Sequence, residues 1–240
     1  MTYDPQRPHS THRRNAPVSQ ALAKLVLSPM TRVVYRPVVI GRENVPKTGP
    51  VIIASNHLAA IDSAVIPLVA PRPVAFLAKA EYFTGTGVKG RANKVFFSSM
   101  GSIPVERGTH RAAQAALDAG LSVLQEGGAF GIYPEGTRSR DGRLYKGRTG
   151  VAWLALASGA PVVPVALTGT ERIQPVGKLM PRIRRITVQF GKPLDFSDRI
   201  GVSPAGPVRR AITDEIMEAI HAMSAQPLAG GYNEHQKADE

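Results

Sequence analysis

The chain contains no cysteine, so disulfides, thiolate metal sites and a cysteine nucleophile are excluded. Aromatic residues make up only 6% of it, and the sequence carries no recognised nucleic-acid-binding module. Nowhere do roughly 20 uncharged apolar residues follow one another, as a membrane-spanning helix requires. Acidic residues are also few, 18 against 30 Lys and Arg, which gives a net charge of +12. This excess favours attraction to a polyanion, whether nucleic acid, anionic lipid or a phosphorylated substrate.

Length and residue pattern indicate one domain. The 240 residues are 43% hydrophobic, which is enough to bury a sizeable core. From residue 37 to residue 226, short β-rich runs alternate with helical patterns. This alternation predicts an α/β fold with a mainly parallel mixed sheet covered by helices. The expected strands are 33–40, 51–55, 74–78, 102–105, 130–133, 162–167 and 186–190, and the expected helices are 63–69, 111–125, 149–157 and an amphipathic C-terminal helix at 207–224.

The two ends of the chain differ from this domain. Residues 1–16 are polar and lack the apolar run of a secretory signal, so we expect a flexible tail on a cytoplasmic protein. Residues 17–36 place apolar side chains near one helical face, with Lys24 and Arg32 among them. That pattern fits a helix packed on the core or an amphipathic helix associated with a membrane surface, and we carry the second forward as the prediction. Residues 227–240 are expected to form another flexible tail.

The most informative segment is Asn56-His57-x₄-Asp62, directly after an apolar strand. In one continuous helix, positions five apart would be rotated by roughly 140°. His57 and Asp62 can therefore meet only if His57 lies on a loop and Asp62 begins the next helix, where it can also cap that helix. A carboxylate held against one imidazole nitrogen fixes the tautomer and makes the other nitrogen a better base. The alternative is a surface histidine beside a plain helix cap.

Other polar side chains follow strands of the predicted sheet. Arg107 ends the stretch 101–107, and Glu135 and Arg138 follow Tyr133 in a strand-to-turn sequence. Because residues beyond the carboxyl ends of parallel strands converge on one crevice, we expect these side chains to lie near His57. The planar fork of arginine suits a phosphate group, although a single arginine is more typical of a solvated surface.

Four blocks follow one another along the chain: Asn56-His57-x₄-Asp62, Gly101-x-Ile103-x-Val105-x-Arg107, Glu135-Gly136-Thr137-Arg138 and Val162-x-Pro164-Val165. In this order they resemble the 1-acylglycerol-3-phosphate acyltransferases and their lysophospholipid and glycerol-phosphate acyltransferase relatives, over roughly residues 38–195. That family often has Phe where this chain has Tyr133, and Pro104 is less usual within the second block.

The resemblance implies that His57 is the general base and that Asp62 orients it. It implies direct transfer of a fatty acyl group from acyl-CoA or an acyl carrier protein to a hydroxyl of 1-acylglycerol-3-phosphate, which gives phosphatidic acid. Direct transfer needs no acyl-enzyme, in keeping with the lack of cysteine and of a Gly-x-Ser-x-Gly elbow. No metal and no cofactor beyond the thioester co-substrate are expected. The residues implied to bind the phosphate-bearing glycerolipid acceptor are Lys79, Arg107, Glu135, Gly136, Thr137, Arg138 and Lys146.

Several alternatives remain at this point. Glycerol-3-phosphate or another lysolipid is the alternative acceptor, and a basic nucleic-acid-binding protein is the alternative from a different class. The clusters at 182–185 and 209–210 can face nucleic acid or anionic lipid, at about 1 kcal/mol per basic residue near a lipid surface. Residues 85–90 match a dinucleotide fingerprint but do not directly follow a strand, so we expect a turn. We predict a peripheral protein on the cytoplasmic side of the cell membrane, with an anionic membrane surface and no nucleic acid as partner.

Overall fold

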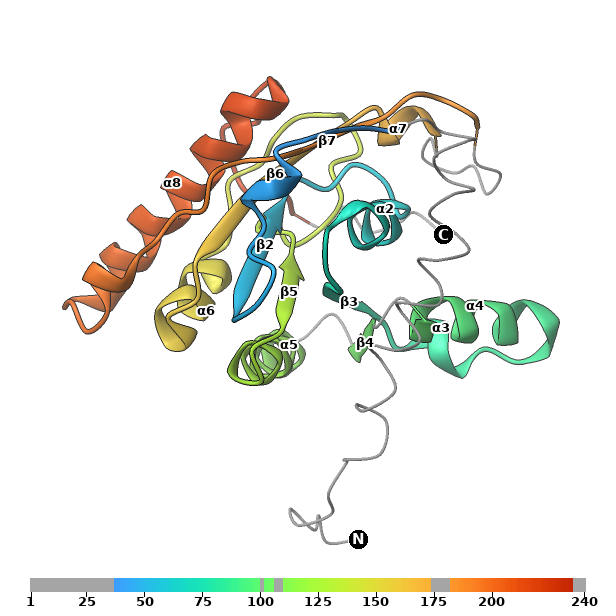
Figure 1. The fold of residues 1–240 in the computed structure, drawn as a ribbon, viewed down its shortest axis with the longest axis horizontal. Coiled ribbons are helices and arrows are strands. Elements are labelled where there is room, and N and C mark those ends of the chain that lie inside the picture. Colours follow the sequence, from blue (N-terminus) through green and yellow to red (C-terminus); the bar gives the residue numbers. More distant parts are fainter. Residues whose placement is uncertain (1–36, 100–101, 106–109, 174–181, 235–240) are drawn as a thin grey trace, which may run out of the picture.

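A computed structural model describes residues 37–99, 102–105, 110–173 and 182–234 of the chain (Figure 1). Within these residues one seven-stranded sheet has the order β1-β7-β6-β2-β5-β3-β4. Its five strands from β6 to β4 run parallel, β7 is antiparallel to β6, and β1 is parallel to β7. The predicted single α/β domain with a mainly parallel mixed sheet is therefore confirmed. The strands are β1 (Val38–Ile40), β2 (Val51–Ser55), β3 (Ala75–Lys79), β4 (Ile103–Val105), β5 (Ala129–Ile132), β6 (Val162–Thr168) and β7 (Thr187–Phe190).

The two central strands explain why the sheet could be predicted. Every residue of β2 is buried, and in β6 only the last residue, Thr168, is exposed. Strands buried on both faces consist of nearly continuous apolar residues, and parallel strands covered by helices have this character. The carboxyl ends of β2, β5 and β6 lie at one edge of the sheet, at Ser55, Ile132 and Thr168. We call this edge the carboxyl edge.

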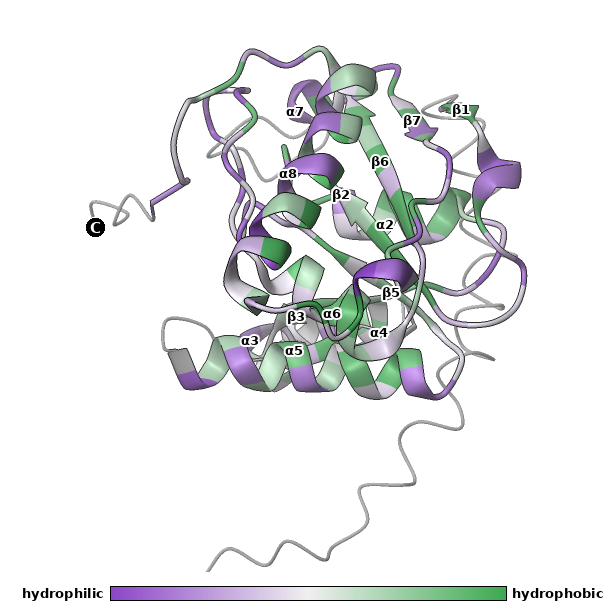
Figure 2. Ribbon diagram, turned by 90° about the vertical axis from the view of Figure 1, so that its left-hand side faces the viewer, coloured by the Kyte–Doolittle hydropathy of each residue, from purple (hydrophilic) through white to green (hydrophobic). Residues whose placement is uncertain are grey.

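Helices cover both faces of the sheet, with a separate apolar core on each side. Helix α2 packs on one face through Val65 and Ile66, whereas α5, α6 and α8 pack on the other (Figure 1). Figure 2 shows β2 and β6 as apolar segments, while α5 alternates between apolar and hydrophilic residues. The α-helices are α2 (Asp62–Val69), α3 (Glu81–Thr84), α4 (Gly87–Ser99), α5 (His110–Gln125), α6 (Gly150–Ser158), α7 (Thr170–Ile173) and α8 (Ala205–Ser224), and the 3-10 helices are η1 (Arg42–Asn44) and η2 (Ser197–Arg199).

After α8 the chain returns across the domain. Gln226 is buried, and backbone hydrogen bonds join Leu144 to Pro227 and to Ala229, and Lys146 to Gly231. We call residues 226–233 the C-terminal strap. Its residues fall almost wholly within 227–240, where the sequence predicts a flexible tail. The strap lies alongside residues 144–146 because these main-chain groups satisfy each other's hydrogen bonds.

The predicted N-terminal tail, 1–16, and the predicted amphipathic helix, 17–36, lie outside the described residues. The predicted C-terminal amphipathic helix is α8. In the described part of the chain, no helix combines the length and the apolar character needed to cross a membrane.

Candidate active site

His57 and Asp62 form the buried centre of the carboxyl edge. The chain leaves β2, runs through a short loop that carries His57, and enters α2 at Asp62. The imidazole Nδ1 lies 2.9 Å from Asp62 Oδ2, and both residues are buried. Because a carboxylate oxygen can only accept, Nδ1 donates, and Nε2 is left as the basic nitrogen. The structure thus brings this pair together in the predicted way, with the histidine on the loop and the aspartate at the start of the helix.

The Asp62 carboxylate also fixes the backbone of that loop. Its Oδ2 accepts the amide hydrogens of Leu58 at 2.7 Å and Ala59 at 2.8 Å, in addition to the imidazole. Three donors on one oxygen stabilise a negative charge there, and a negative charge stabilises a protonated imidazole next to it. Oδ1 of the same carboxylate is buried without a hydrogen-bond partner in the described part of the structure.

Tyr133 is a further residue of the site, and sequence reasoning treated it only as a mild departure from a pattern. Its ring stacks on the imidazole of His57, with the ring centroids 3.9 Å apart and the planes 9° apart. Its hydroxyl lies 3.0 Å from Ser63 Oγ on α2. The phenol ring therefore restricts the orientation of the imidazole from one face, and the Tyr133–Ser63 hydrogen bond fixes the phenol in turn.

Glu135 is fully buried beside the same loop. Its Oε1 accepts the amide hydrogen of His57 at 3.2 Å, and its Oε2 accepts that of Tyr145 at 2.9 Å. Burial raises the pKa of the Glu135 carboxyl to about 7, against the two hydrogen bonds, which lower it; the nearby carboxylates of Asp141 and Asp62 raise it further. In this arrangement the Glu135 carboxylate positions the main chain of His57 and that of Tyr145. The predicted contact of its side chain with the acceptor stays a prediction.

Asn56 connects the His57 loop to two distant parts of the chain. Its side-chain amide donates to Leu167 O at 2.9 Å, and its carbonyl oxygen accepts the Leu167 amide hydrogen at 2.8 Å. The same Nδ2 donates to Gln226 Oε1 at 2.7 Å, and Gln226 Nε2 donates to Gly142 O at 2.8 Å. The asparagine before the catalytic candidate is therefore a buried link between β2, β6 and the C-terminal strap.

The next block forms an exposed basic loop, residues 136–148, beside His57. The amide of Ser139 donates to His57 O at 2.8 Å, so Arg138 immediately precedes a direct contact with the histidine main chain. Gly136 has φ +82°, and a Cβ there would lie 3.1 Å from the Arg148 side chain, which explains the glycine. The loop contains one acidic residue, Asp141, and five exposed basic ones: Arg138, Arg140, Arg143, Lys146 and Arg148.

The remaining predicted site residues are placed as follows. Thr137 is half-buried between Gly136 and Arg138. Lys146 is exposed, with its Nζ 5.6 Å from the ring centroid of Tyr232 in the C-terminal strap. Lys79 ends β3, with its backbone at the carboxyl edge of the sheet. Arg107 lies outside the described residues. The structure thus brings His57 and Asp62 together with the block from Glu135 to Arg138.

Comparison with known proteins places this site in a family. Residues 36–168 match the family model described as Acyltransferase, which covers β2, the His57 loop, the basic loop and β6. The chain belongs to the acyltransferase family. The resemblance that the four sequence blocks predicted is therefore confirmed.

Individual members of the family are similar to this chain in sequence. The chain is 36% identical over 134 residues to a 1-acyl-sn-glycerol-3-phosphate acyltransferase of Borreliella burgdorferi, an alignment that covers 56% of this chain and 52% of that protein. It is 33% identical over 157 residues to the chloroplastic 1-acyl-sn-glycerol-3-phosphate acyltransferase BAT2 of Brassica napus, over 65% of this chain and 44% of the relative. The chain thus spans about half the length of these curated relatives.

A solved structure supports the fold. The crystal structure of the 1-acyl-sn-glycerophosphate acyltransferase PlsC of Thermotoga maritima is similar to this one with a TM-score of 0.61, over 86% of this chain and 84% of that one. The sequence identity is 22%, so the likeness establishes the shared α/β fold.

Proposed function

We propose that this protein is an O-acyltransferase that moves a fatty acyl group from an acyl thioester to a hydroxyl of 1-acylglycerol-3-phosphate, giving phosphatidic acid. The observation that carries the proposal is the buried His57–Asp62 pair, which leaves imidazole Nε2 as a base at the carboxyl edge. The printed names of the matching family members, 1-acyl-sn-glycerol-3-phosphate acyltransferases, support the choice of acceptor.

In the proposed mechanism, Nε2 of His57 removes the proton from the acceptor hydroxyl as its oxygen attacks the thioester carbonyl carbon. Asp62 stabilises the imidazolium that forms. The tetrahedral intermediate then collapses, the carbon–sulfur bond breaks, and the protonated His57 returns its proton to the leaving thiolate. A general base positioned in this way is typically worth about 10²- to 10⁴-fold in rate.

The basic loop, residues 136–148, supports a phosphate-bearing acceptor. Its five exposed basic side chains outnumber a single acidic one, which produces a positive potential next to His57. Arg138 is the member that adjoins the Ser139–His57 contact, so its guanidinium is our candidate for binding the acceptor phosphate through two parallel hydrogen bonds. Thr137, Lys146, Lys79 and Arg107 are proposed to complete the acceptor site.

The donor and the location are also proposals. Either acyl-CoA or an acyl carrier protein thioester suits the mechanism, since each supplies the same carbonyl and thiol leaving group. A glycerolipid acceptor with one acyl chain resides in a membrane, so we propose that the protein works as a peripheral protein on the cytoplasmic side of the cell membrane. Glycerol-3-phosphate, which is soluble, is the alternative acceptor.

The direct test is acyl transfer from a radiolabelled acyl-CoA and from the matching acyl carrier protein, with lysophosphatidate and glycerol-3-phosphate offered side by side. We expect labelled phosphatidic acid from lysophosphatidate. Labelled lysophosphatidate from glycerol-3-phosphate alone would move the protein to the alternative acceptor. A folded protein that acylates neither acceptor from either donor would contradict the proposed function.

A further inference from the structure

A short arginine loop, residues 182–185, stands out on the surface. Arg182, Arg184 and Arg185 are exposed, and between them Ile183 exposes 66% of its surface. None of the three guanidinium groups pairs with a carboxylate in the described part of the chain. The arginine loop therefore combines three cations with one exposed apolar side chain.

The arginine loop lies at the carboxyl edge, and hydrogen bonds and packing through the end of β6 connect it to the His57 loop. Asn56, next to His57, is hydrogen-bonded to Leu167 near the end of β6. Two residues further on, Gly169 has φ +90°, and a Cβ on it would come within 2.8 Å of Arg185 O. The arginine loop therefore packs on the turn that follows β6, at the same edge as the candidate active site.

The described domain begins at this edge as well. Because β1 runs opposite to β2, its first residue, Val38, lies at the carboxyl edge, where its amide donates to Ile186 O at 2.9 Å. Val38 is itself 42% exposed. The described domain thus starts beside the arginine loop, and the sequence that precedes it includes the amphipathic pattern of residues 17–36.

The second basic cluster of the sequence, residues 209–210, makes different contacts. Arg210 forms an ion pair with Asp214 one helical turn away, and its Nη1 donates to Gly147 O at 2.7 Å. Arg209 lies beside it on α8 and donates to Ala205 O at 3.3 Å. The charge of Arg210 is therefore paired with a carboxylate. Arg209 donates only to a backbone carbonyl, as Arg184 does to Ile183 O. The two clusters differ because residues 182–185 place three exposed arginines together without a paired carboxylate in the described structure.

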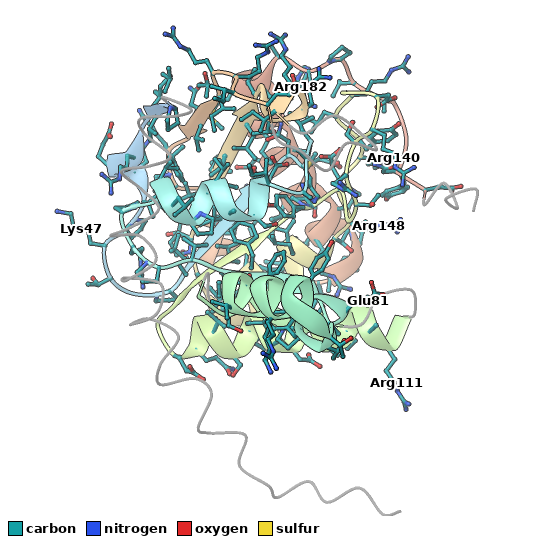
Figure 3. The ribbon with its side chains drawn as sticks, turned by 90° about the vertical axis from the view of Figure 1, so that its right-hand side faces the viewer. Lys47, Glu81, Arg111, Arg140, Arg148 and Arg182 are labelled. Atoms are coloured by element: carbon teal, nitrogen blue, oxygen red, sulfur yellow. The ribbon has the colours of Figure 1, made fainter. Side chains whose placement is uncertain are left out.

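We propose that the arginine loop, with Ile183 and Val38, is the surface on which the protein lies against an anionic lipid bilayer. This inference rests on the proposed function and names its membrane-contacting face. The guanidinium groups bind lipid phosphates, and Ile183 inserts between the headgroups. The bilayer is the partner that fits, because the loop combines cations with an apolar side chain at the edge where a lipid-borne acceptor must reach His57. Arg182 is shown in Figure 3, well separated from Lys47.

The test compares two triple variants of the full chain that remove equal charge. R182Q/R184Q/R185Q changes the arginine loop, whereas R42Q/K47Q/K192Q changes three exposed basic residues at the opposite edge of the sheet. Binding is measured by co-sedimentation with phosphatidylcholine vesicles, with and without phosphatidylglycerol. At low salt we expect the first variant to bind anionic vesicles roughly 100-fold more weakly, from about 1 kcal/mol per arginine, and the control to bind within about threefold of wild type.

A third variant separates insertion from charge. Ile183→Ser should weaken vesicle binding about tenfold, and this loss should persist at high salt because it is not electrostatic. Equal losses in both triple variants would overturn the proposal, since binding would then follow net charge alone. Unchanged vesicle binding by R182Q/R184Q/R185Q would also overturn it. So would loss of duplex DNA binding in that variant without loss of vesicle binding, which would assign the loop to nucleic acid.

A second assay tests the membrane surface and the proposed function separately. It measures turnover on lysophosphatidate dispersed in non-ionic detergent, where no bilayer is needed. All three variants should retain wild-type activity there, because none changes a residue of the candidate site. A wild-type protein that binds vesicles through the loop but has no activity in detergent would contradict the proposed function and leave the membrane surface intact.

Discussion

The two sides of the candidate site are built in opposite ways. On one side, Asn56, His57, Asp62 and Glu135 are buried, and hydrogen bonds connect each of them to main chain or to another side chain. On the other side, the basic loop, residues 136–148, presents its cations to solvent. The buried side holds the proposed base, His57, with little freedom, and the exposed side offers positive charge to a ligand that arrives from outside. Substitutions on the two sides should therefore change different kinetic constants.

The largest effect is expected for His57→Ala, which removes the base from the buried side. We expect kcat to fall by about 10²- to 10⁴-fold with the fold intact, because the backbone hydrogen bonds of residue 57 with Glu135 and Ser139 do not need the imidazole. The measurement is steady-state acyl transfer, with circular dichroism of the same preparation as the control. Undiminished turnover by a folded variant would remove His57 from the mechanism.

A smaller and different effect is expected on the exposed side. Arg138→Gln removes a charge-assisted hydrogen bond worth about 1.5–3 kcal/mol, so the KM for lysophosphatidate should rise roughly 10- to 100-fold while the KM for the acyl donor stays unchanged. Arg140→Gln is the matched control, since Arg140 is exposed in the same loop. An equal change in both KM values, or an equal effect of the two substitutions, would show that Arg138 does not bind the acceptor phosphate.

Tyr133 tests how firmly the buried side holds the imidazole. Tyr133→Leu removes the ring stacked on His57, and we expect kcat to fall about tenfold with both KM values unchanged. Tyr133→Phe keeps the ring and loses only the hydrogen bond to Ser63, so its kcat should stay within about threefold of wild type. Should the two variants lose kcat equally, the hydroxyl and not the stacked ring would be responsible.

The last prediction concerns the stability of the fold and the buried carboxyl of Glu135. Its pKa in the folded protein, about 7, exceeds the ordinary value of 4.5, so the folded state binds the proton more tightly than the unfolded state does. The stabilisation of the folded protein by this bound proton is complete below about pH 4.5, and it is lost as the pH rises through 7. Between pH 5 and pH 8 the free energy of unfolding should fall by about 2–3 kcal/mol because of this carboxyl.

Denaturant unfolding at the two pH values measures this change. In Glu135→Gln the pH-dependent part should disappear, because the amide does not titrate. The variant should be less stable than wild type at pH 5, because the amide nitrogen cannot accept one of the two backbone hydrogen bonds. The same slope in both proteins would assign the pH dependence to other groups, such as the histidines.

Most of the sheet and the His57–Asp62 pair could be predicted from the sequence, because the patterns that indicate them are local. The buried strands β2 and β6 are continuous apolar segments, and contact between His57 and Asp62 at this spacing is possible only with a loop followed by a helix start. The turn expected at residues 85–90 is correct only in part, because helix α4 begins at Gly87. A Cβ on Gly90 would lie 2.1 Å from the Gly85 carbonyl, so the glycine permits close packing of that helix.

Long-range contacts could not be predicted in this way. Gln226 reaches Asn56 across 170 positions of sequence, and nothing in the residues around either one indicates the hydrogen bond. The hydrogen bonds that join the C-terminal strap to Leu144 and Lys146 come from main-chain groups, which carry no sequence signal. The stacking of Tyr133 on His57 likewise depends on β5 lying next to β2 in the sheet. Local patterns therefore identified the proposed reacting groups, and only the fold showed what positions them.

The measurement that tests the account most directly is a double-mutant cycle of kcat over wild type, His57→Ala, Asp62→Asn and the double variant, each corrected for its folded fraction. If Asp62 acts through His57, as the 2.9 Å contact between Nδ1 and Oδ2 indicates, the double variant should be no slower than His57→Ala alone. Losses that multiply in the double variant would contradict the account, because they would show that the carboxylate and the imidazole contribute independently.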